Sequence, residues 1–192
     1  MSKGNIFWCK HCLNMSTRPR ITFDHRGWCN ACVWMEEKKK LNWKKREEEL
    51  INLFSKHKSE NNEFDCVVPV SGGKDGSYVA YTLKHKYKIN PLAINVTPPL
   101  SLQLGEENLK NFAASGFNLM QIHPNQEVMR FLDKRGFIDK GSPYFGWMVA
   151  IHSAVIKTAL KFNISLIFYG EDGEVEYGGS TETKHTSLMS IE

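Results

Sequence analysis

The most constraining feature of this sequence is a glycine-rich segment, Ser71-Gly72-Gly73-Lys74-Asp75-Gly76-Ser77, between an apolar run and an amphipathic stretch. The apolar run at residues 64–70 is typical of a buried parallel strand. In residues 78–87, apolar side chains recur at four-residue intervals, which predicts a helix. A strand, a glycine turn and a helix in this order form an anion site, because the first amide N–H groups and the helix dipole point at the ligand.

The residue types within the loop suit a bound nucleotide. Gly72 and Gly73 let the backbone approach phosphate oxygens, and Lys74 can neutralise their charge. Ser71 and Ser77 can donate hydroxyl hydrogen bonds. Asp75 only accepts when it is ionised, so we expect it to orient the loop or help hold a metal ion. We therefore assign Lys74 and Asp75 as catalytic. The sequence has no G-x-x-x-x-G-K-[ST] motif, so the loop is not a Walker A loop.

The remaining pattern predicts an α/β fold built on a doubly wound, mostly parallel sheet. Further strands are expected at 90–96, 117–123 and 164–169, and helices at 105–115, 127–135 and 148–162. Ligands bind beyond the carboxyl ends of strands in such sheets, where both the glycine loop and residues 170–174 fall.

An acidic cluster follows the last expected strand. Gly170, Glu171 and Asp172 are candidate nucleotide contacts, and the carboxylates, with Glu174 and Glu176, could hold Mg²⁺ against the phosphates of ATP. An ordinary solvated acidic loop is the alternative.

Four cysteines in two CxxC pairs mark the N-terminal region. Cys9 and Cys12 are separated from Cys29 and Cys32 by 16 residues, which is a spacing typical of a tetrahedral zinc site. Four thiolates leave no open position, so we expect a structural zinc ion. The fifth cysteine, Cys66, lies in the apolar run and is predicted to be a core residue.

These features divide the chain into a zinc module at 1–35, a linking helix at 36–62 and a nucleotide-binding domain at 63–192. The helical pattern spans about 33–58.

Residues 1–64 carry 13 Lys and Arg against 8 Asp and Glu, a net charge of +5, whereas residues 65–192 carry 12 against 13. We interpret the basic residues mainly as a solvated helix face, so nucleic acid is not the expected partner. With no apolar run long enough for a membrane span and no signal sequence, we expect a cytoplasmic protein without membrane contact.

The loop resembles the SGGxDS motif of the PP-loop ATP pyrophosphatases, with Gly76 in the place of the motif's serine and Ser77 one position later. Which hydroxyl contacts phosphate stays open. The resemblance implies that ATP is split to AMP and pyrophosphate while a carbonyl-type oxygen is adenylated. It also implies that the adenine edge lies against the backbone of Asn95 and Val96, near the end of the second strand.

Over the whole chain, the sequence resembles the N-acetyl sugar amidotransferases of bacterial surface-polysaccharide synthesis, including lipopolysaccharide and O-antigen. The supporting segments are the cysteine module, the loop, residues 143–148 (Pro-Tyr-Phe-Gly-Trp-Met) and residues 168–179 (Phe-Tyr-Gly-Glu-Asp-Gly-Glu-Val-Glu-Tyr-Gly-Gly). The resemblance implies a nucleotide-activated N-acetyl sugar as substrate and ammonia supplied by a separate glutaminase subunit, giving an acetamidino sugar.

Two alternatives remain open. A PP-loop tRNA-modifying enzyme of the thiolase kind would also combine such a loop with a cysteine module, but residues 67–192 contain no cysteine. A non-catalytic module that binds adenine nucleotide is the other alternative. It follows from the expectation that the domain at 63–192 is truncated relative to related enzymes.

Overall fold

The structure is a computed structural model that describes residues 5–58, 63–171, 173–182 and 184. The chain divides into two compact units. One unit combines residues 1–47 with 172–192 and is called the cysteine unit; the other, residues 48–171, is called the sheet unit. Among the described residues, no helix has both the length and the apolar character needed to cross a bilayer.

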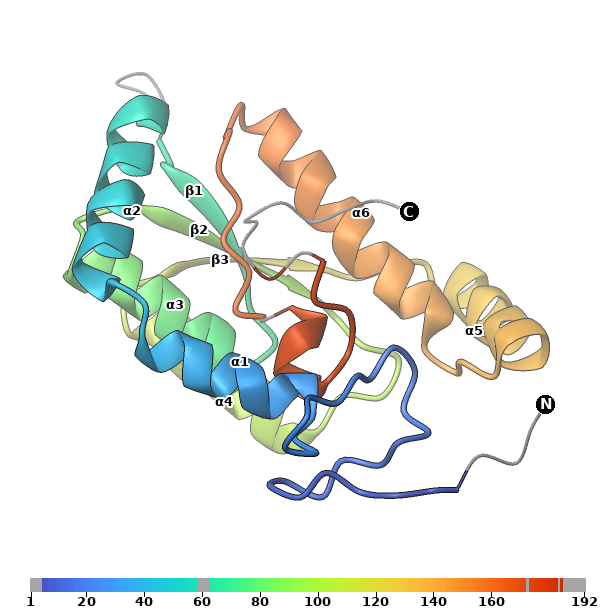
Figure 1. Cartoon of the computed structure of the whole chain (residues 1–192). Coiled ribbons are helices and arrows are strands. Elements are labelled where there is room, and N and C mark those ends of the chain that lie inside the picture. Colours follow the sequence, from blue (N-terminus) through green and yellow to red (C-terminus); the bar gives the residue numbers. More distant parts are fainter. Residues whose placement is uncertain (1–4, 59–62, 172, 183, 185–192) are drawn as a thin grey trace. The chain divides into compact units, whose positions relative to one another are not determined.

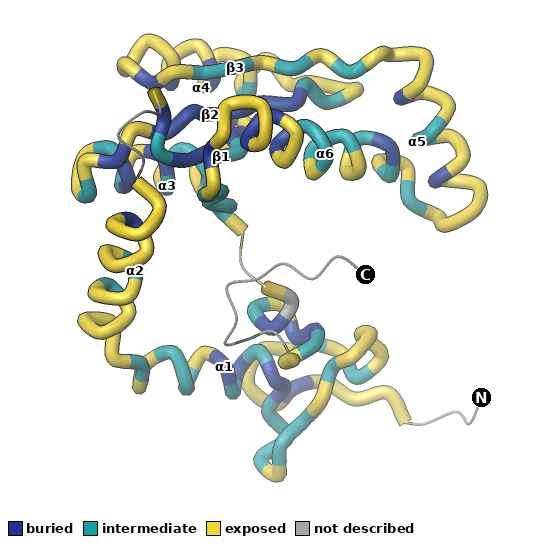
Figure 2. The backbone as a smooth tube through the Cα atoms, turned by 90° about the horizontal axis from the view of Figure 1, so that it is seen from above, coloured by how far each residue is buried: buried dark blue, intermediate teal, exposed yellow. Residues whose placement is uncertain are grey.

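The sheet unit is built on three parallel strands, β1 (Cys66–Pro69), β2 (Pro91–Val96) and β3 (Asn118–Ile122), in the order β1-β2-β3 (Figure 1). In register, Val67 lies opposite Leu92, and Leu92 lies opposite Asn118. Every residue of β2 is buried, whereas β3 has exposed positions, as Figure 2 shows by colour. The predicted parallel α/β fold is confirmed.

Helices cover both faces of this sheet. Side chains alternate along β1, so Cys66 and Val68 join one apolar cluster while Val67 joins another. The first cluster is filled by α2 (Trp43–His57), α3 (Lys74–His85) and α4 (Gln103–Ala114), and the second by α6 (Phe145–Lys161). The arrangement is therefore doubly wound, with the core in two layers.

Helix α5 (Gln126–Lys140) packs on α6 through two glycines. A Cβ on Gly136 would lie 2.3 Å from Cβ of Phe145, and one on Gly146 would lie 2.6 Å from Cβ of Leu132. Any side chain at either position would separate the helices. The segment at 143–148 that resembles the amidotransferases thus contains a packing residue at this crossing.

The strand expected at 164–169 is wrong in part, because it forms only one parallel bridge, Ile167 with Val67. The amide of Val67 donates to Leu166 O, and the amide of Phe168 donates to Val67 O, both at 2.9 Å. The next bond of a parallel ladder would need an amide hydrogen on Pro69, which proline lacks. The ladder beside β1 therefore stops after one bridge.

The cysteine unit contains α1 (Asn30–Lys39) and a short 3-10 helix, η1 (Glu174–Tyr177), which contact each other. The single helix expected at 33–58 is wrong, since α1 ends at Lys39 and α2 begins at Trp43. Asn42 starts the second helix, and its side-chain oxygen accepts from the amide of Lys45 at 3.0 Å. Asparagine favours this capping position over a helix interior, which explains the break.

Candidate nucleotide and metal sites

The glycine loop follows β1 at the carboxyl edge of the sheet and leads directly into α3. Gly73 is the N-cap, with φ −84° and ψ 173°, so no capping side chain extends from that position over the first amides of the helix. These amides and the positive end of the helix dipole face the loop. Two chain segments flank β1, namely β2 on one side and residues 164–169 on the other, and the loop lies between them. This is the position at which α/β sheets bind ligands.

Three glycines are required by close backbone contacts around the loop. Gly72 has φ +81°, and a Cβ there would lie 2.4 Å from Gly105 O. A Cβ on Gly76 would lie 2.4 Å from Pro69 O. A Cβ on Gly170 would lie 2.7 Å from the amide nitrogen of Gly76. The loop is thus held against α4 on one side and against Gly170 on the other. The close contact at Gly76 explains why glycine stands where the SGGxDS motif has serine.

Polar side chains of the loop are exposed. Lys74 Nζ pairs with Asp75 Oδ1 at 2.6 Å, with 88% and 63% of the two side chains exposed, so both are accessible to a ligand. The Ser77 hydroxyl donates to Gly73 O at 2.8 Å, and Ser71 Oγ accepts from the Gly73 amide at 3.4 Å. Both hydroxyls therefore brace the loop around Gly73, and neither is singled out as the phosphate contact.

The predicted adenine-edge positions lie at the carboxyl end of β2. Asn95 is buried, and its side-chain amide donates to Val70 O at 2.9 Å, immediately before the loop. Val96 O accepts from the indole Nε1 of Trp147 at 3.3 Å. The geometry brings Asn95 to the base of the loop, while contact of either residue with adenine stays a prediction.

The acidic cluster is only partly brought together at the loop. Glu171 is exposed and follows Gly170, whereas Asp172 lies outside the described residues. Glu176 belongs to the cysteine unit, where its carboxylate pairs with Lys38 and accepts from Trp34 Nε1 at 2.7 Å. Both partners of Glu176 lie on α1, so within its own unit its charge is compensated, and a role for Glu176 in binding Mg²⁺ stays a prediction.

A cavity of about 450 Å³, here called the edge pocket, opens at the carboxyl ends of β2 and β3. Thr97 follows β2 and His123 follows β3, and Thr97 Oγ1 lies 3.0 Å from His123 Nδ1. Asp133, on α5, accepts from the amides of Gly146 and Trp147 at 2.8 and 3.3 Å, which caps the start of α6. The sequence patterns assigned none of Thr97, His123 and Asp133 to a site, because no motif surrounds them.

The four predicted zinc ligands come together in the cysteine unit. The sulfur atoms of Cys9, Cys12, Cys29 and Cys32 all lie within 4.8 Å of one another, and closest pairs are 3.5–3.8 Å apart. A tetrahedral zinc ion with Zn–S bonds of about 2.3 Å requires sulfur–sulfur edges of about 3.8 Å. The cluster therefore fits zinc, and its position beneath Ile21, Phe23, Trp28 and Ala31 makes it the centre of a small core.

The thiol pKa values also suit a metal site. Burial raises the pKa of Cys9, but the amides of Cys29, His11 and Cys12 outweigh it and lower that pKa to about 6. Burial raises the pKa values of Cys12 and Cys32, so these thiols need a cation to ionise at neutral pH.

The fifth cysteine, Cys66, is fully buried in β1, as predicted. Burial, with the charge of Asp65, raises the pKa of its thiol to about 12. All five cysteines are among the described residues. Cys66 is the one that lies in the sheet unit, so that unit exposes no cysteine.

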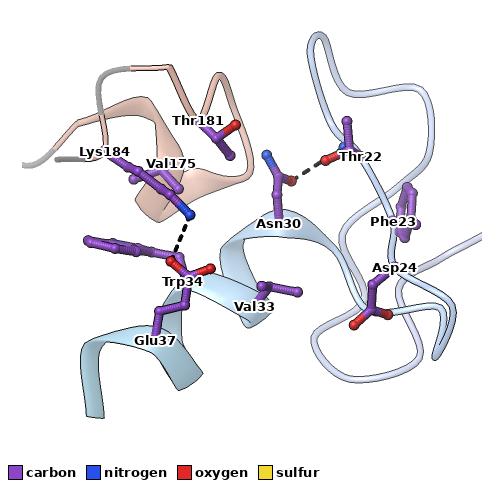
Figure 3. A pocket seen from close by; sticks show the side chains of 10 residues that line it. All are labelled: Thr22, Phe23, Asp24, Asn30, Val33, Trp34, Glu37, Val175, Thr181 and Lys184. Atoms are coloured by element: carbon purple, nitrogen blue, oxygen red, sulfur yellow. Dashed lines mark hydrogen bonds and ion pairs between the residues drawn. The ribbon is translucent and has the colours of Figure 1, made fainter. Parts of the chain in front are cut away.

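A second cavity, of about 220 Å³, lies within the cysteine unit, and Figure 3 shows its lining side chains. Lys184 Nζ pairs with Glu37 Oε2 at 2.7 Å beside Trp34, and the Asn30 side chain accepts from the Thr22 amide at 3.4 Å. The side-chain amide of Asn30 also donates to Gly179 O. These bonds connect α1 with Gly179 and Lys184, so Gly179, at the end of the segment that resembles the amidotransferases, has a structural role.

Comparison with known proteins gives partial matches. No protein-family model matches the chain. An uncharacterised protein of Methanocaldococcus jannaschii is 30% identical over 104 residues, which cover 54% of this chain and 37% of that protein. A predicted subunit of tRNA methyltransferase from M. jannaschii aligns with a TM-score of 0.41 and 26% identity, over 59% of this chain and 56% of that chain. An NH3-dependent NAD synthetase of Campylobacter jejuni aligns with a TM-score of 0.42 and 19% identity, over 65% and 55%.

The chain thus spans about a third of the length of the curated relative and just over half of the two solved structures. At this coverage and these TM-scores, the function rests on the loop and the cysteine cluster.

Proposed function

We propose that this chain is an ATP-dependent enzyme of the PP-loop type that adenylates the acetamido oxygen of a nucleotide-activated N-acetyl sugar and replaces that oxygen with nitrogen from ammonia. The observation that carries the proposal is the glycine loop, which follows β1 and begins α3 with an uncapped, exposed N-terminus. The sugar and the ammonia donor rest on the resemblance of residues 143–148 and 168–179 to the sugar amidotransferases.

The loop supports pyrophosphate release as the chemical outcome. ATP supplies an electrophilic α-phosphorus, and the sugar's acetamido oxygen displaces pyrophosphate from it; ammonia then adds to the activated carbon, and AMP leaves with the oxygen. The amides at Gly73 and Lys74, with the Lys74 ammonium, would hold the β- and γ-phosphates as one leaving group. We place Mg²⁺ beside Asp75 and Glu171, because both carboxylates are exposed and Gly170 lies against the loop.

The deciding experiment follows the fate of labelled ATP with ammonia and candidate N-acetyl sugar nucleotides. Turnover should give AMP and pyrophosphate, and glutamine should replace ammonia only when a glutaminase is added. Lys74→Ala should reduce turnover about a hundredfold, or about 3 kcal/mol, since it removes charge stabilisation from the leaving group. ADP as the sole nucleotide product would contradict adenylation.

A tRNA-modifying enzyme is the second candidate, and exposed basic side chains in the cysteine unit favour it. Lys10, Arg18 and Arg20 are all exposed in that unit. Sulfur transfer by cysteine is disfavoured, because Cys66 is fully buried and the other four cysteines form the metal cluster. Binding to tRNA should weaken steeply with salt if only the basic surface is involved. Tight, salt-resistant and tRNA-specific binding would favour this candidate over the sugar enzyme.

A further inference from the structure

We propose that the edge pocket is the acceptor site of the sheet unit, and that it binds a phosphate-bearing sugar through Arg130. The reaction in this inference rests on the proposed function, whereas the location of the acceptor site rests on the pocket itself. The cavity volume of about 450 Å³ falls within the range of roughly 300–1,000 Å³ typical of small-molecule sites. This volume is of the order that a sugar ring with one or two phosphates needs.

The position of the edge pocket suits an acceptor that must meet ATP. Strands β1, β2 and β3 are parallel, so the glycine loop after β1 and the pocket after β2 and β3 share one edge of the sheet. The segment after β2 lines the pocket from Thr97 to Leu100 and then reaches Gly105, whose carbonyl touches Gly72 of the loop. One continuous segment therefore borders both places.

The arginine of the pocket suits an anionic ligand. Arg130 and Asp133 both line it from α5. The Asp133 carboxylate accepts two amides at the start of α6, where the helix dipole also compensates its charge. Among the residues that the structure describes, no carboxylate forms an ion pair with Arg130, which is exposed. A guanidinium in this setting is suited to a phosphate, which it can bind through two parallel hydrogen bonds.

The other lining groups suit a sugar ring. Thr97 and His123 form a hydrogen-bonded pair that can offer donors and acceptors to hydroxyl groups. Tyr144 also lines the pocket; its ring is exposed and lies 6.2 Å, between centroids, from the ring of Trp147, whose indole donates to Val96 O. Apolar contact comes from Met129. A sugar can stack on the aromatic ring while its hydroxyls reach the polar pair and its phosphate reaches Arg130.

Equilibrium binding tests this assignment without turnover. The probes are UDP-N-acetylglucosamine, N-acetylglucosamine 1-phosphate and free N-acetylglucosamine, titrated by calorimetry in the absence of ATP. Arg130→Gln should weaken binding of the two phosphate-bearing probes about tenfold to a hundredfold, as expected for loss of a hydrogen-bonded charge. Arg135→Gln is the matched control, because Arg135 lies on the same helix, is 57% exposed and pairs with Asp139 instead.

Three outcomes would overturn the assignment. The first is no binding of UDP-N-acetylglucosamine to the unaltered protein, and the second is equal weakening by Arg130→Gln and Arg135→Gln. The third is a loss of ATP affinity in Arg130→Gln with sugar affinity unchanged, which would make the pocket part of the nucleotide site. Product analysis separates the two proposals. Binding that depends on Arg130 without AMP formation would refute the proposed reaction alone, whereas AMP formation with an unchanged KM for sugar in Arg130→Gln would refute the pocket alone.

Discussion

Replacing Gly76 with alanine tests the contact that fixes the glycine loop against β1. The added Cβ would lie 2.4 Å from Pro69 O, whereas ordinary contacts begin at 3.4 Å, so two backbone segments must separate by about 1 Å. Alanine in place of glycine within a helix gains about 1 kcal/mol, while forcing apart a packed contact costs up to about 3 kcal/mol. The clash outweighs the gain, and we expect Gly76→Ala to lose about 2 kcal/mol of unfolding free energy.

The assay is thermal unfolding followed by far-UV circular dichroism, with Gly105→Ala as the matched control. A loss of about 2 kcal/mol corresponds to a Tm lowered by about 4–8 °C for a chain of this size. Gly105 is also helical, but its added Cβ would meet only Ser71 O at 3.9 Å, so the same change there should raise Tm. A higher Tm for Gly76→Ala, or a lower one for Gly105→Ala, would refute the reasoning.

Three further predictions concern the loop, the metal and acid stability. Gly73→Val should abolish ATP binding in calorimetry while leaving the circular dichroism spectrum unchanged, because its Cβ would meet only Ser71 Oγ, at 3.3 Å. Native mass spectrometry should find one zinc per chain, and Cys32→Ser should lose it; full occupancy in that variant would contradict the ligand set. Burial raises the pKa of Asp24, but the Trp28 amide and Arg26 outweigh it and lower that pKa, and Arg26 also lowers the pKa of Glu36. Such depressed folded-state pKa values stabilise the fold above about pH 5 and less as pH falls, so Arg26→Gln should flatten the acid limb of a Tm–pH curve.

Local patterns predicted most of the sheet unit. The alternation of apolar runs with helical periodicity located β2 and β3, and the glycines of the loop indicated the close backbone approach that the structure shows at Gly72 and Gly76. The clustering of the four cysteines was predicted from their spacing alone, because two CxxC turns can converge on one ion whatever conformation the intervening loop adopts.

The errors concern interactions between distant residues or competition between local ones. The ladder at 164–169 depends on which residue of β1 faces it, and the missing amide of Pro69 decides where it stops. The ion pair of Glu176 with Lys38 was not visible in the acidic run, because its partner lies far away in sequence. Asp133 had no motif around it, and only the packing of α5 on α6 makes it a helix cap and a pocket residue. The break at Asn42 is the exception, because the asparagine was a visible local signal.

The cysteine unit can form its full set of contacts only after both of its chain segments, which are far apart in the sequence, have been synthesised. Asn30 bonds Gly179, Trp34 bonds Glu176, and Lys184 pairs with Glu37, across separations of 149, 142 and 147 residues. At about 5–20 residues per second, roughly seven to thirty seconds pass on the ribosome between the two halves of each pair. The sheet unit, whose residues emerge within that interval, can fold first. Residues 5–39 are therefore made before the sheet unit but complete their own unit after it, and until then Trp34, which is buried in the complete unit, lacks Glu176 as its partner.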